Sequence, residues 1–167
     1  ETHVRRSSLS LRVADFGNVI DYRNGEAEAY YIRESSMCQT QSYRAPEVIF
    51  KLRFDYAIDM WSLGAILLEL YLGRIVFQCT NSATLIESMQ KLLGPLPHHL
   101  FESGKLYNRY FPATPNSTRK SQQPYSRSRT IAAMKEMLGI EDIQFVSFVQ
   151  GMLTWDPKLR MTPDQAL

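Results

Sequence analysis

Residues 58–73 read IDMWSLGAILLELYLG, and a helix built from them would be apolar on nearly every face. Asp59 and Ser62 stand early in the run, and Gly73 follows its last apolar residue, as is usual where a helix ends. A helix that is apolar all round is normally buried in a larger core. We therefore predict that this helix organises the domain.

The overall composition is typical of a globular protein. The chain has 167 residues, of which 44% are hydrophobic and 22% charged, with a net charge of +2. The length predicts about one domain, and the small charge disfavours nucleic-acid binding by the whole chain. The apolar run 63–72 is broken by Glu69 and is too short to span a bilayer, so we expect no membrane role. Cys38 and Cys79 fit neither a disulfide framework nor a zinc site, which predicts free thiols in a reducing compartment.

Helical patterns follow the central run on its C-terminal side. Residues 82–94 place five apolar side chains on one stripe and end in glycine. Helical periodicity returns in 131–138 and in 143–156, and 160–167 reads as a helix start. The expected capping residues are Ser82 for the first helix and Thr162 for the last, with Pro163 at the first helical position and Gln165 as capping-box partner.

Residues 103–130 form a basic stretch rich in Ser, Thr, Pro, Asn and Gln, without an acidic residue. This composition favours a solvated, mobile loop, and a docking surface for phosphorylated or acidic partners is the alternative. Tyrosines lie between the basic residues, but their spacing matches no nucleic-acid recognition module, so a nucleic-acid partner is not expected. The basic residues are Lys105, Arg109, Arg119, Lys120, Arg127 and Arg129.

The N-terminal side begins with a short apolar run, 11–14, which is predicted to be a strand ending in Asp15-Phe16-Gly17. A carboxylate at a strand end can bind a hard cation such as Mg²⁺, or it can begin a turn and face water. The Asp-Phe-Gly motif by itself favours the turn. A long polar loop, 18–42, follows, and then YRAPEVIF at 43–50, where Pro46 suits the first turn of a short helix.

The order of these parts resembles the C-terminal lobe of the eukaryotic protein kinases. Asp-Phe-Gly at 15–17 is followed by Ala-Pro-Glu at 45–47, by D-x-W-S-x-G at 59–64, and by Arg160 in an LxxDPxxR-like stretch. The resemblance covers essentially the whole chain, and the ordered set of motifs is very specific.

Within the kinases, the chain is similar to the CMGC group and to its dual-specificity tyrosine-regulated (DYRK) family. Arg44 before Ala45 matches the CMGC arginine, and 103–130 lies where CMGC kinases have an insertion. The resemblance implies an α+β protein-kinase-like fold, of which 1–167 is a mostly α-helical part of the C-lobe, from the Asp-Phe-Gly motif to the start of the last helix. Because the chain starts with Glu1, we expect a piece of a longer protein whose N-lobe and catalytic loop lie outside these residues.

The function implied by the resemblance is transfer of the ATP γ-phosphate to protein Ser or Thr residues, with Tyr left open. ATP and Mg²⁺ are the implied cofactors, and protein substrates are the implied partners. The alternative is a pseudokinase or scaffold that binds partners without catalysis. The fragment alone is expected to be inactive, because a kinase also needs a glycine-rich loop, a strand lysine, a helix glutamate and an HRD-type loop. An intracellular location is expected, in the cytoplasm or the nucleus.

Three residues of the Asp-Phe-Gly motif are implied to bind the cofactor. Asp15 would ligate the Mg²⁺ that neutralises charge on the phosphates. Phe16 would be buried, either as a switch between active and inactive states or as a plain core aromatic. Gly17 would let the backbone swing.

Residues 15–47 correspond by resemblance to the activation segment, the floor on which a substrate peptide lies. Thr40 matches the residue that hydrogen-bonds the catalytic Asp. The alternative is that its hydroxyl only hydrogen-bonds the backbone of its own loop. Arg44, with Gln41 and Ser42 beside it, shapes the pocket that favours proline after the phosphorylated residue.

Four residues are assigned structural roles. Glu47 and Arg160 resemble the buried ion pair that ties this floor to the base of the lobe. Asp59 would cap its helix, accept hydrogen bonds from the catalytic loop, or do both. Trp61 belongs to the same helix motif.

The chain departs from the DYRK pattern at two positions, which puts self-activation on tyrosine in doubt. Met37 stands where a tyrosine is expected, and Gln41 stands where an arginine is usual. The substitute phosphorylation sites are Tyr30, Tyr31, Ser35 and Ser36.

Overall fold

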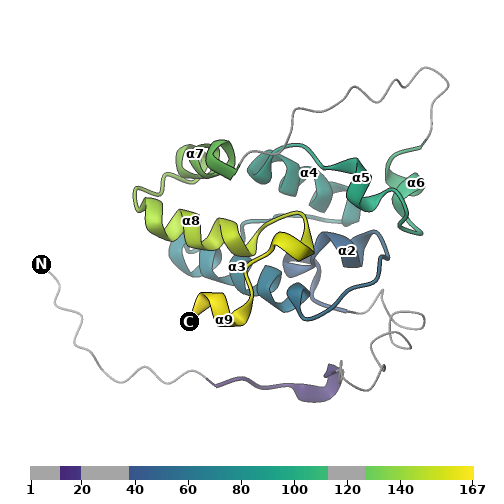
Figure 1. The fold of residues 1–167 in the computed structure, drawn as a ribbon, viewed down its shortest axis with the longest axis horizontal. Helices are drawn as coiled ribbons and strands as arrows, with labels where there is room; N and C mark the ends of the chain where they lie inside the picture. The colour runs from purple at the N-terminus through teal and green to yellow at the C-terminus, as the bar shows by residue number, and fades with distance from the viewer. Residues whose placement is uncertain (1–11, 20–37, 113–126) are drawn as a thin grey trace, which may run out of the picture.

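A computed structural model describes residues 12–19, 38–112 and 127–167, and the last two ranges form a body of packed helices (Figure 1). None of these residues belongs to a strand. The helices are α2 (Pro46–Ile49), α3 (Ala57–Leu72), α4 (Ser82–Leu93), α5 (His98–Phe101), α6 (Tyr107–Tyr110), α7 (Arg127–Leu138), α8 (Ile143–Met152) and α9 (Pro163–Ala166). Three 3-10 turns complete the description: η1 (Phe16–Asn18), η3 (Gln41–Tyr43) and η4 (Pro157–Leu159).

Helix α3 lies at the centre of this body, as its apolar sequence predicts. It packs against α8, α8 packs against α7, and α7 packs against α4. Gly64 allows the close approach of α3 to α8, because a Cβ atom there would lie 2.9 Å from the Cβ of Met152. The helix ends at Gly73, whose φ of 67° is in the left-handed region that favours glycine.

One face of α3 is not buried, and here the expectation of a helix covered on every side is wrong. Leu63 and Ile66 are 40% and 41% exposed, and Leu70 is 74% exposed. They follow the spacing of one helical face. Among the described residues, no element covers that face enough to bury it.

Helix α4 has the predicted bounds and the predicted buried stripe, but its cap differs by one residue. Asn81, not Ser82, is the N-cap, and its side chain accepts a hydrogen bond from the backbone N–H of Thr84. The Thr84 hydroxyl in turn accepts from the Asn81 N–H, which completes a capping box. The buried stripe consists of Leu85, Ile86, Met89, Leu92 and Leu93.

The other predicted helix starts are present. Pro46 occupies the first turn of α2, and Thr162 and Gln165 form a capping box at α9. Of the helices in the described ranges, none has the length and apolarity that crossing a bilayer requires.

The first part of the basic stretch 103–130 is packed, which corrects its prediction as a solvated loop. Tyr107 in α6 is 1% exposed and its ring lies against Phe50. Gly104 sits so close to the backbone that a Cβ there would lie 2.5 Å from the Phe50 carbonyl oxygen. Helix α7 also begins before the predicted 131–138. The buried Tyr107 therefore anchors this segment to Phe50, while residues 113–126 lie outside the description.

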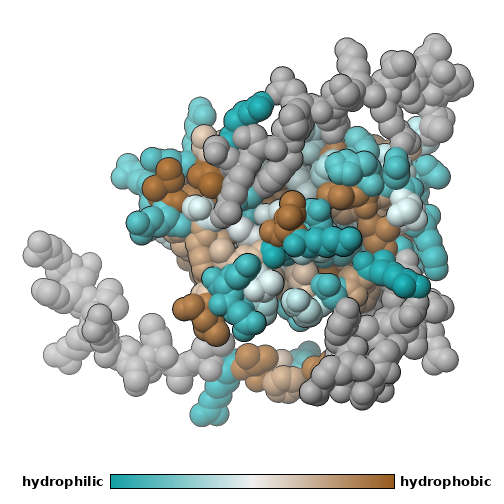
Figure 2. All heavy atoms as spheres, viewed as in Figure 1, coloured by the Kyte–Doolittle hydropathy of each residue, from teal (hydrophilic) through white to brown (hydrophobic). Residues whose placement is uncertain are grey.

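The predicted strand at 11–14 does not form over residues 12–14. Val13 is 73% exposed and Phe16 is 66% exposed, so the expected burial of Phe16 is also wrong. A strand needs a partner strand for its backbone hydrogen bonds, and the described residues supply none. Figure 1 draws residues 12–19 (purple) apart from the helical body, and Figure 2 shows hydrophobic atoms exposed on that segment.

Candidate functional site

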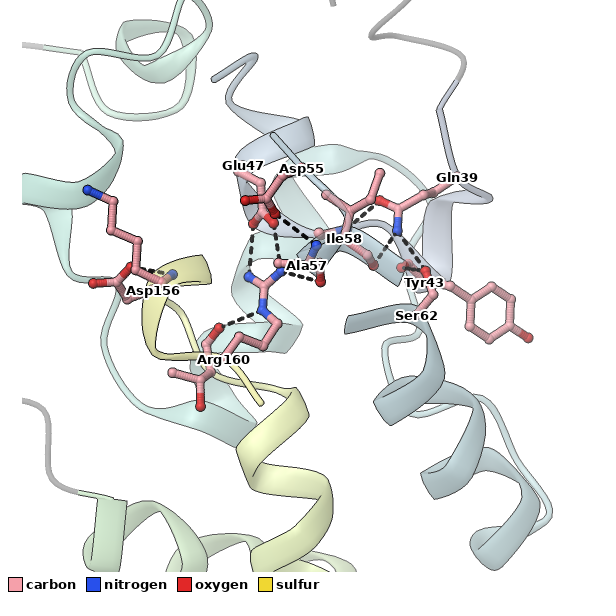
Figure 3. Close-up of polar contacts among 12 residues, drawn as sticks. Gln39, Tyr43, Glu47, Asp55, Ala57, Ile58, Ser62, Asp156 and Arg160 are labelled. Carbon is pink, nitrogen blue, oxygen red and sulfur yellow. Dashed lines mark hydrogen bonds and ion pairs between the residues drawn. The ribbon is translucent and has the colours of Figure 1, made fainter. Parts of the chain in front are cut away.

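The segment that precedes α2 is fixed to α3 by the side-chain amide of Gln39 (Figure 3). The amide nitrogen donates to the Ile58 carbonyl at 2.8 Å and to the Ser62 hydroxyl at 2.7 Å. The amide oxygen accepts from the Ala45 backbone N–H at 2.9 Å. Gln39 has a φ of 61°, an uncommon conformation for a residue with a side chain. These three bonds hold both ends of the turn η3.

Arg44 stabilises the same turn from the other side. Its Nε donates to the Cys38 carbonyl at 3.0 Å, and one terminal nitrogen donates to the Gln39 carbonyl at 2.8 Å. Burial is the main cause that raises the pKa of the Cys38 thiol, and the negative charge of Asp59 adds to it. The Cys38 thiol is therefore protonated and weakly nucleophilic near neutral pH.

Tyr43 connects the turn to two positions along α3. Its hydroxyl donates to a Glu69 carboxylate oxygen at 2.6 Å, and this hydrogen bond is the main cause that raises the Tyr43 pKa. Its carbonyl accepts from the Ser62 hydroxyl at 2.9 Å. Tyr43 is thus bonded to α3 through its backbone at Ser62 and through its side chain at Glu69.

Glu47 and Arg160 form the ion pair that their sequence context predicts. Two guanidinium nitrogens donate to the two carboxylate oxygens at 2.6 and 3.0 Å, and both side chains are almost fully buried. Arg160 also donates to the carbonyls of Ala57 at 2.8 Å and Thr154 at 3.2 Å. Figure 3 shows these bonds joining α2, α3 and the η4 region. A bidentate pair whose guanidinium also donates to two backbone carbonyls is an arrangement that can be tolerated in a core.

Trp61 packs beneath this ion pair. Its ring lies 5.2 Å from the Arg160 guanidinium carbon and stacks on Phe77 with the ring centres 5.9 Å apart. Trp155 contacts it from another side, at 6.1 Å between ring centres. The predicted structural residue is therefore at the centre of the core.

The three other predicted substrate-floor residues lie at or next to η3 and are at least partly exposed. Thr40 precedes the turn; its side chain is exposed and makes no capping hydrogen bond, so its hydroxyl does not serve the local backbone. The Ser42 hydroxyl lies 3.7 Å from the Cys79 sulfur. The Gln41 carbonyl accepts from the Arg44 N–H at 3.2 Å. Their roles toward a substrate stay predictions.

Asp15 is exposed and has left-handed backbone angles, with φ 64° and ψ 65°. The left-handed residue of the motif is thus Asp15 and not Gly17, whose φ lies outside that region. The Asp15 side chain makes no capping bond to η1, and the residue is exposed to water. An accessible carboxylate suits Mg²⁺, which commonly takes one or two carboxylates and completes its shell with waters and phosphates. In the described ranges, no group of three or more His, Cys, Asp or Glu side chains could hold a metal by itself.

The protein kinase domain family matches residues 4–167 of this chain. The chain belongs to the protein kinase family. It is 33% identical over 166 residues to dual specificity tyrosine-phosphorylation-regulated kinase 4 of Homo sapiens. The matched region covers 90% of this chain and 31% of that protein. It is 34% identical to dual specificity tyrosine-phosphorylation-regulated kinase 2 of Drosophila melanogaster over 97% of this chain and 22% of that protein.

A further kinase relative is dual specificity protein kinase CLK4 of Homo sapiens, 31% identical over 98% of this chain and 34% of that protein. The kinase chain therefore spans about a third or less of the length of these relatives. The mostly helical fold of the described residues agrees with a kinase C-lobe.

Asp59 does not cap α3 in this kinase domain. The N-cap is Tyr56, and the carboxylate of Asp55 before it accepts from the Ala57 N–H at 2.8 Å, while Asp59 lies inside the first turn. Asp59 is exposed as a whole residue, yet partial burial of its carboxylate raises its pKa. Its predicted bonds to a catalytic loop lie beyond the described residues.

Sequence reasoning missed Gln39, Tyr43 and Asp55. Gln39 and Tyr43 act through partners far along the chain, so no local pattern marks them. Asp55 could have been found, because Asp side chains commonly accept a hydrogen bond from the backbone N–H two residues further on. The predicted phosphorylation sites Tyr30, Tyr31, Ser35 and Ser36, and also Met37, lie outside the described residues.

Proposed function

We propose that the protein containing this kinase domain transfers the γ-phosphoryl group of ATP to serine or threonine hydroxyls of protein substrates. The observation that best supports this is the rigid attachment of residues 38–47 to α3 and Arg160. Phosphoryl transfer depends chiefly on positioning and on charge neutralisation, and a substrate floor must therefore be held still.

Several of the described residues hold the substrate floor in place or flank it. Gln39 and Tyr43 hold the floor to α3, and the Glu47–Arg160 pair holds it to the base of the lobe. Arg44 keeps its guanidinium beside the floor through two backbone carbonyls. Thr40 leaves an exposed hydroxyl beside this turn, where it could orient a catalytic carboxylate.

Asp15 is the residue of this chain that would hold Mg²⁺. When bound, Mg²⁺ neutralises negative charge on the phosphate oxygens as it develops during transfer. The exposed carboxylate of Asp15 is open to such an ion, and its left-handed backbone sets the side chain at the beginning of η1. Phe16 and Gly17 follow it in the same motif, and their roles toward ATP are part of this proposal.

The test is a phosphotransfer assay of the full-length protein with ATP, Mg²⁺ and a Ser-Pro peptide. Asp15→Asn should lower the turnover number by about 100-fold or more, as removal of a key transition-state stabiliser does. Asp164→Asn, which changes an exposed acidic residue in α9, is the matched control and should behave as the wild type. Transfer that Asp15→Asn leaves unchanged would contradict the role of Asp15.

A pseudokinase or scaffold is the second candidate, favoured by Gln41 where the related kinases usually have arginine. It predicts that the folded full-length protein shows no transfer above background under the same conditions. That outcome would overturn the kinase proposal and leave the floor as a surface for binding partners.

A further inference from the structure

A hollow of about 550 Å³ lies between the Arg44–Lys51 segment, the start of α4 and helix α6. Arg44, Lys51 and Arg109 all line it, and none of the described residues in its lining is acidic. Its apolar lining comes from Val48, Ile49, Leu106 and Tyr110. A half-apolar cavity with three cations on its rim is suited to an anion attached to an organic chain.

The fold brings these cations together from distant parts of the sequence. Arg44 is fixed by the carbonyls of Cys38 and Gln39. Arg109 is placed by the packed α6 segment, where the Leu106 N–H donates to the Phe50 carbonyl at 3.2 Å. In Figure 1, α2 and α6 lie toward the same side of the body. The first part of the basic stretch is thus held against the substrate floor.

The start of α4 adds to the positive character of the hollow. Asn81, Ser82 and Ala83 line it, and the first N–H groups of a helix have no acceptor within the helix. Helix α4 has 12 residues, so the positive end of its dipole also faces this region. This contribution only supports the cationic side chains, which are the principal observation.

We propose that this hollow binds the phosphate of a phosphorylated side chain in the protein substrate, close to the residue that the kinase phosphorylates. The proposal rests on the proposed function, because it places the ligand on a substrate peptide lying along residues 38–47. A phosphate suits the hollow better than a carboxylate does, since it has about −1.5 to −2 charges and three acceptor oxygens. The substrate class is therefore a protein that another kinase has already phosphorylated.

The test measures binding of labelled peptides to the full-length protein by fluorescence anisotropy at low salt. Each peptide has one Ser-Pro acceptor and, at one flanking position in turn, phosphoserine, glutamate or serine. For at least one position, the phosphoserine peptide should bind about tenfold more tightly than its serine and glutamate counterparts, as expected for charge-assisted pairing with several cations.

Arg109→Gln should reduce this preference about threefold or more, because it removes one charge from a partly exposed site. Arg74→Gln is the matched control, since Arg74 is also an exposed arginine but lies outside the hollow. It should keep the full preference. Because Arg109 is exposed, both variants should retain the thermal unfolding midpoint of the wild type, which is measured alongside.

Three results would overturn the proposal. The first is equal affinity for the three peptides at every position, and the second is a preference that Arg109→Gln leaves intact. The third is displacement of the phosphoserine peptide by inorganic phosphate at a phosphate concentration no higher than the dissociation constant of the peptide. Binding needs no phosphotransfer, so the two proposals fail separately. An active kinase without the phosphoserine preference refutes only the proposal that the hollow binds phosphate. An inactive protein that shows the preference refutes only the proposed kinase activity.

Discussion

Among single residues, Arg160 makes the densest set of buried polar contacts that the structure describes. Its guanidinium group neutralises Glu47 and satisfies two backbone carbonyls at the same time. We expect Arg160→Met to lower the free energy of unfolding by about 3–5 kcal/mol, because the Glu47 charge is left buried without a partner. Urea denaturation of the purified protein measures this loss.

The control for that substitution is Lys158→Met, which changes an exposed cation two residues away. Its effect should stay within about 0.5 kcal/mol, as for other surface substitutions. A similar small loss for Arg160→Met would show that the ion pair does not stabilise the fold.

The Tyr43 hydroxyl gives a second prediction at this scale, one that depends on pH. The bond to Glu69 raises the Tyr43 pKa in the folded state, so its stabilisation is fully present below the unfolded pKa of about 10 and is lost as the pH rises through the folded pKa. Tyr43→Phe should cost about 0.5–1 kcal/mol at pH 7, because the bond is only partly buried.

The same difference between wild type and Tyr43→Phe should shrink above about pH 10, where unfolded tyrosine ionises. Unfolding curves recorded as a pH series provide the measurement. Tyr71→Phe is the control, since Tyr71 stacks on Phe145 and its exposed side chain should show no such trend. A Tyr43→Phe effect that does not change with pH would argue against the bond to Glu69.

Among the elements, the contact between α3 and α8 depends on Gly64. An alanine Cβ there would meet Met152 at 2.9 Å and Leu153 at 3.0 Å, closer than ordinary packing allows. Gly64→Ala should therefore cost about 1–3 kcal/mol through overpacking, although alanine favours a helix over glycine by about 1 kcal/mol. Thermal unfolding can detect such a loss.

Gly17→Ala is the matched control for this contact, because the nearest atom to its Cβ would be at an ordinary 3.6 Å. We expect no clear destabilisation there. If Gly64→Ala raised the unfolding midpoint, helix propensity would outweigh packing at this position, and α3 and α8 would not be in tight contact.

For the whole molecule, the exposed face of α3 governs how residues 1–167 behave when expressed alone. Leu63, Ile66 and Leu70 form a row of apolar side chains in water, and such patches favour association. We expect the isolated chain to self-associate at micromolar concentration. The double substitution Leu63→Lys and Leu70→Lys should shift it toward the monomer in sedimentation velocity.

Leu159→Lys serves as the control for that experiment, because Leu159 is 72% exposed but lies outside the α3 face. It should leave the association unchanged. A monomeric wild-type chain would contradict the role assigned to this face.

The amino-acid sequence by itself determined the positions of the long helices α3, α4 and α8, and the family. The capping box at α9, the Pro46 start of α2, the Gly73 end of α3 and the buried stripe of α4 all follow from interactions within one or two helical turns, which a linear pattern records. The Glu47–Arg160 pair was also predicted, although only through the resemblance to a family in which both residues occur.

Only the tertiary structure decided which residues hold the candidate site together. Gln39 bonds to residues 19 and 23 positions away, and the hollow joins Arg44 to Arg109 across α2, α4 and α6. The burial of Tyr107, the exposure of Phe16 and the open face of α3 depend likewise on which elements lie next to each other. Hydrogen bonds and burial between distant segments are set by three-dimensional packing, and a local sequence pattern does not show which distant segments become neighbours.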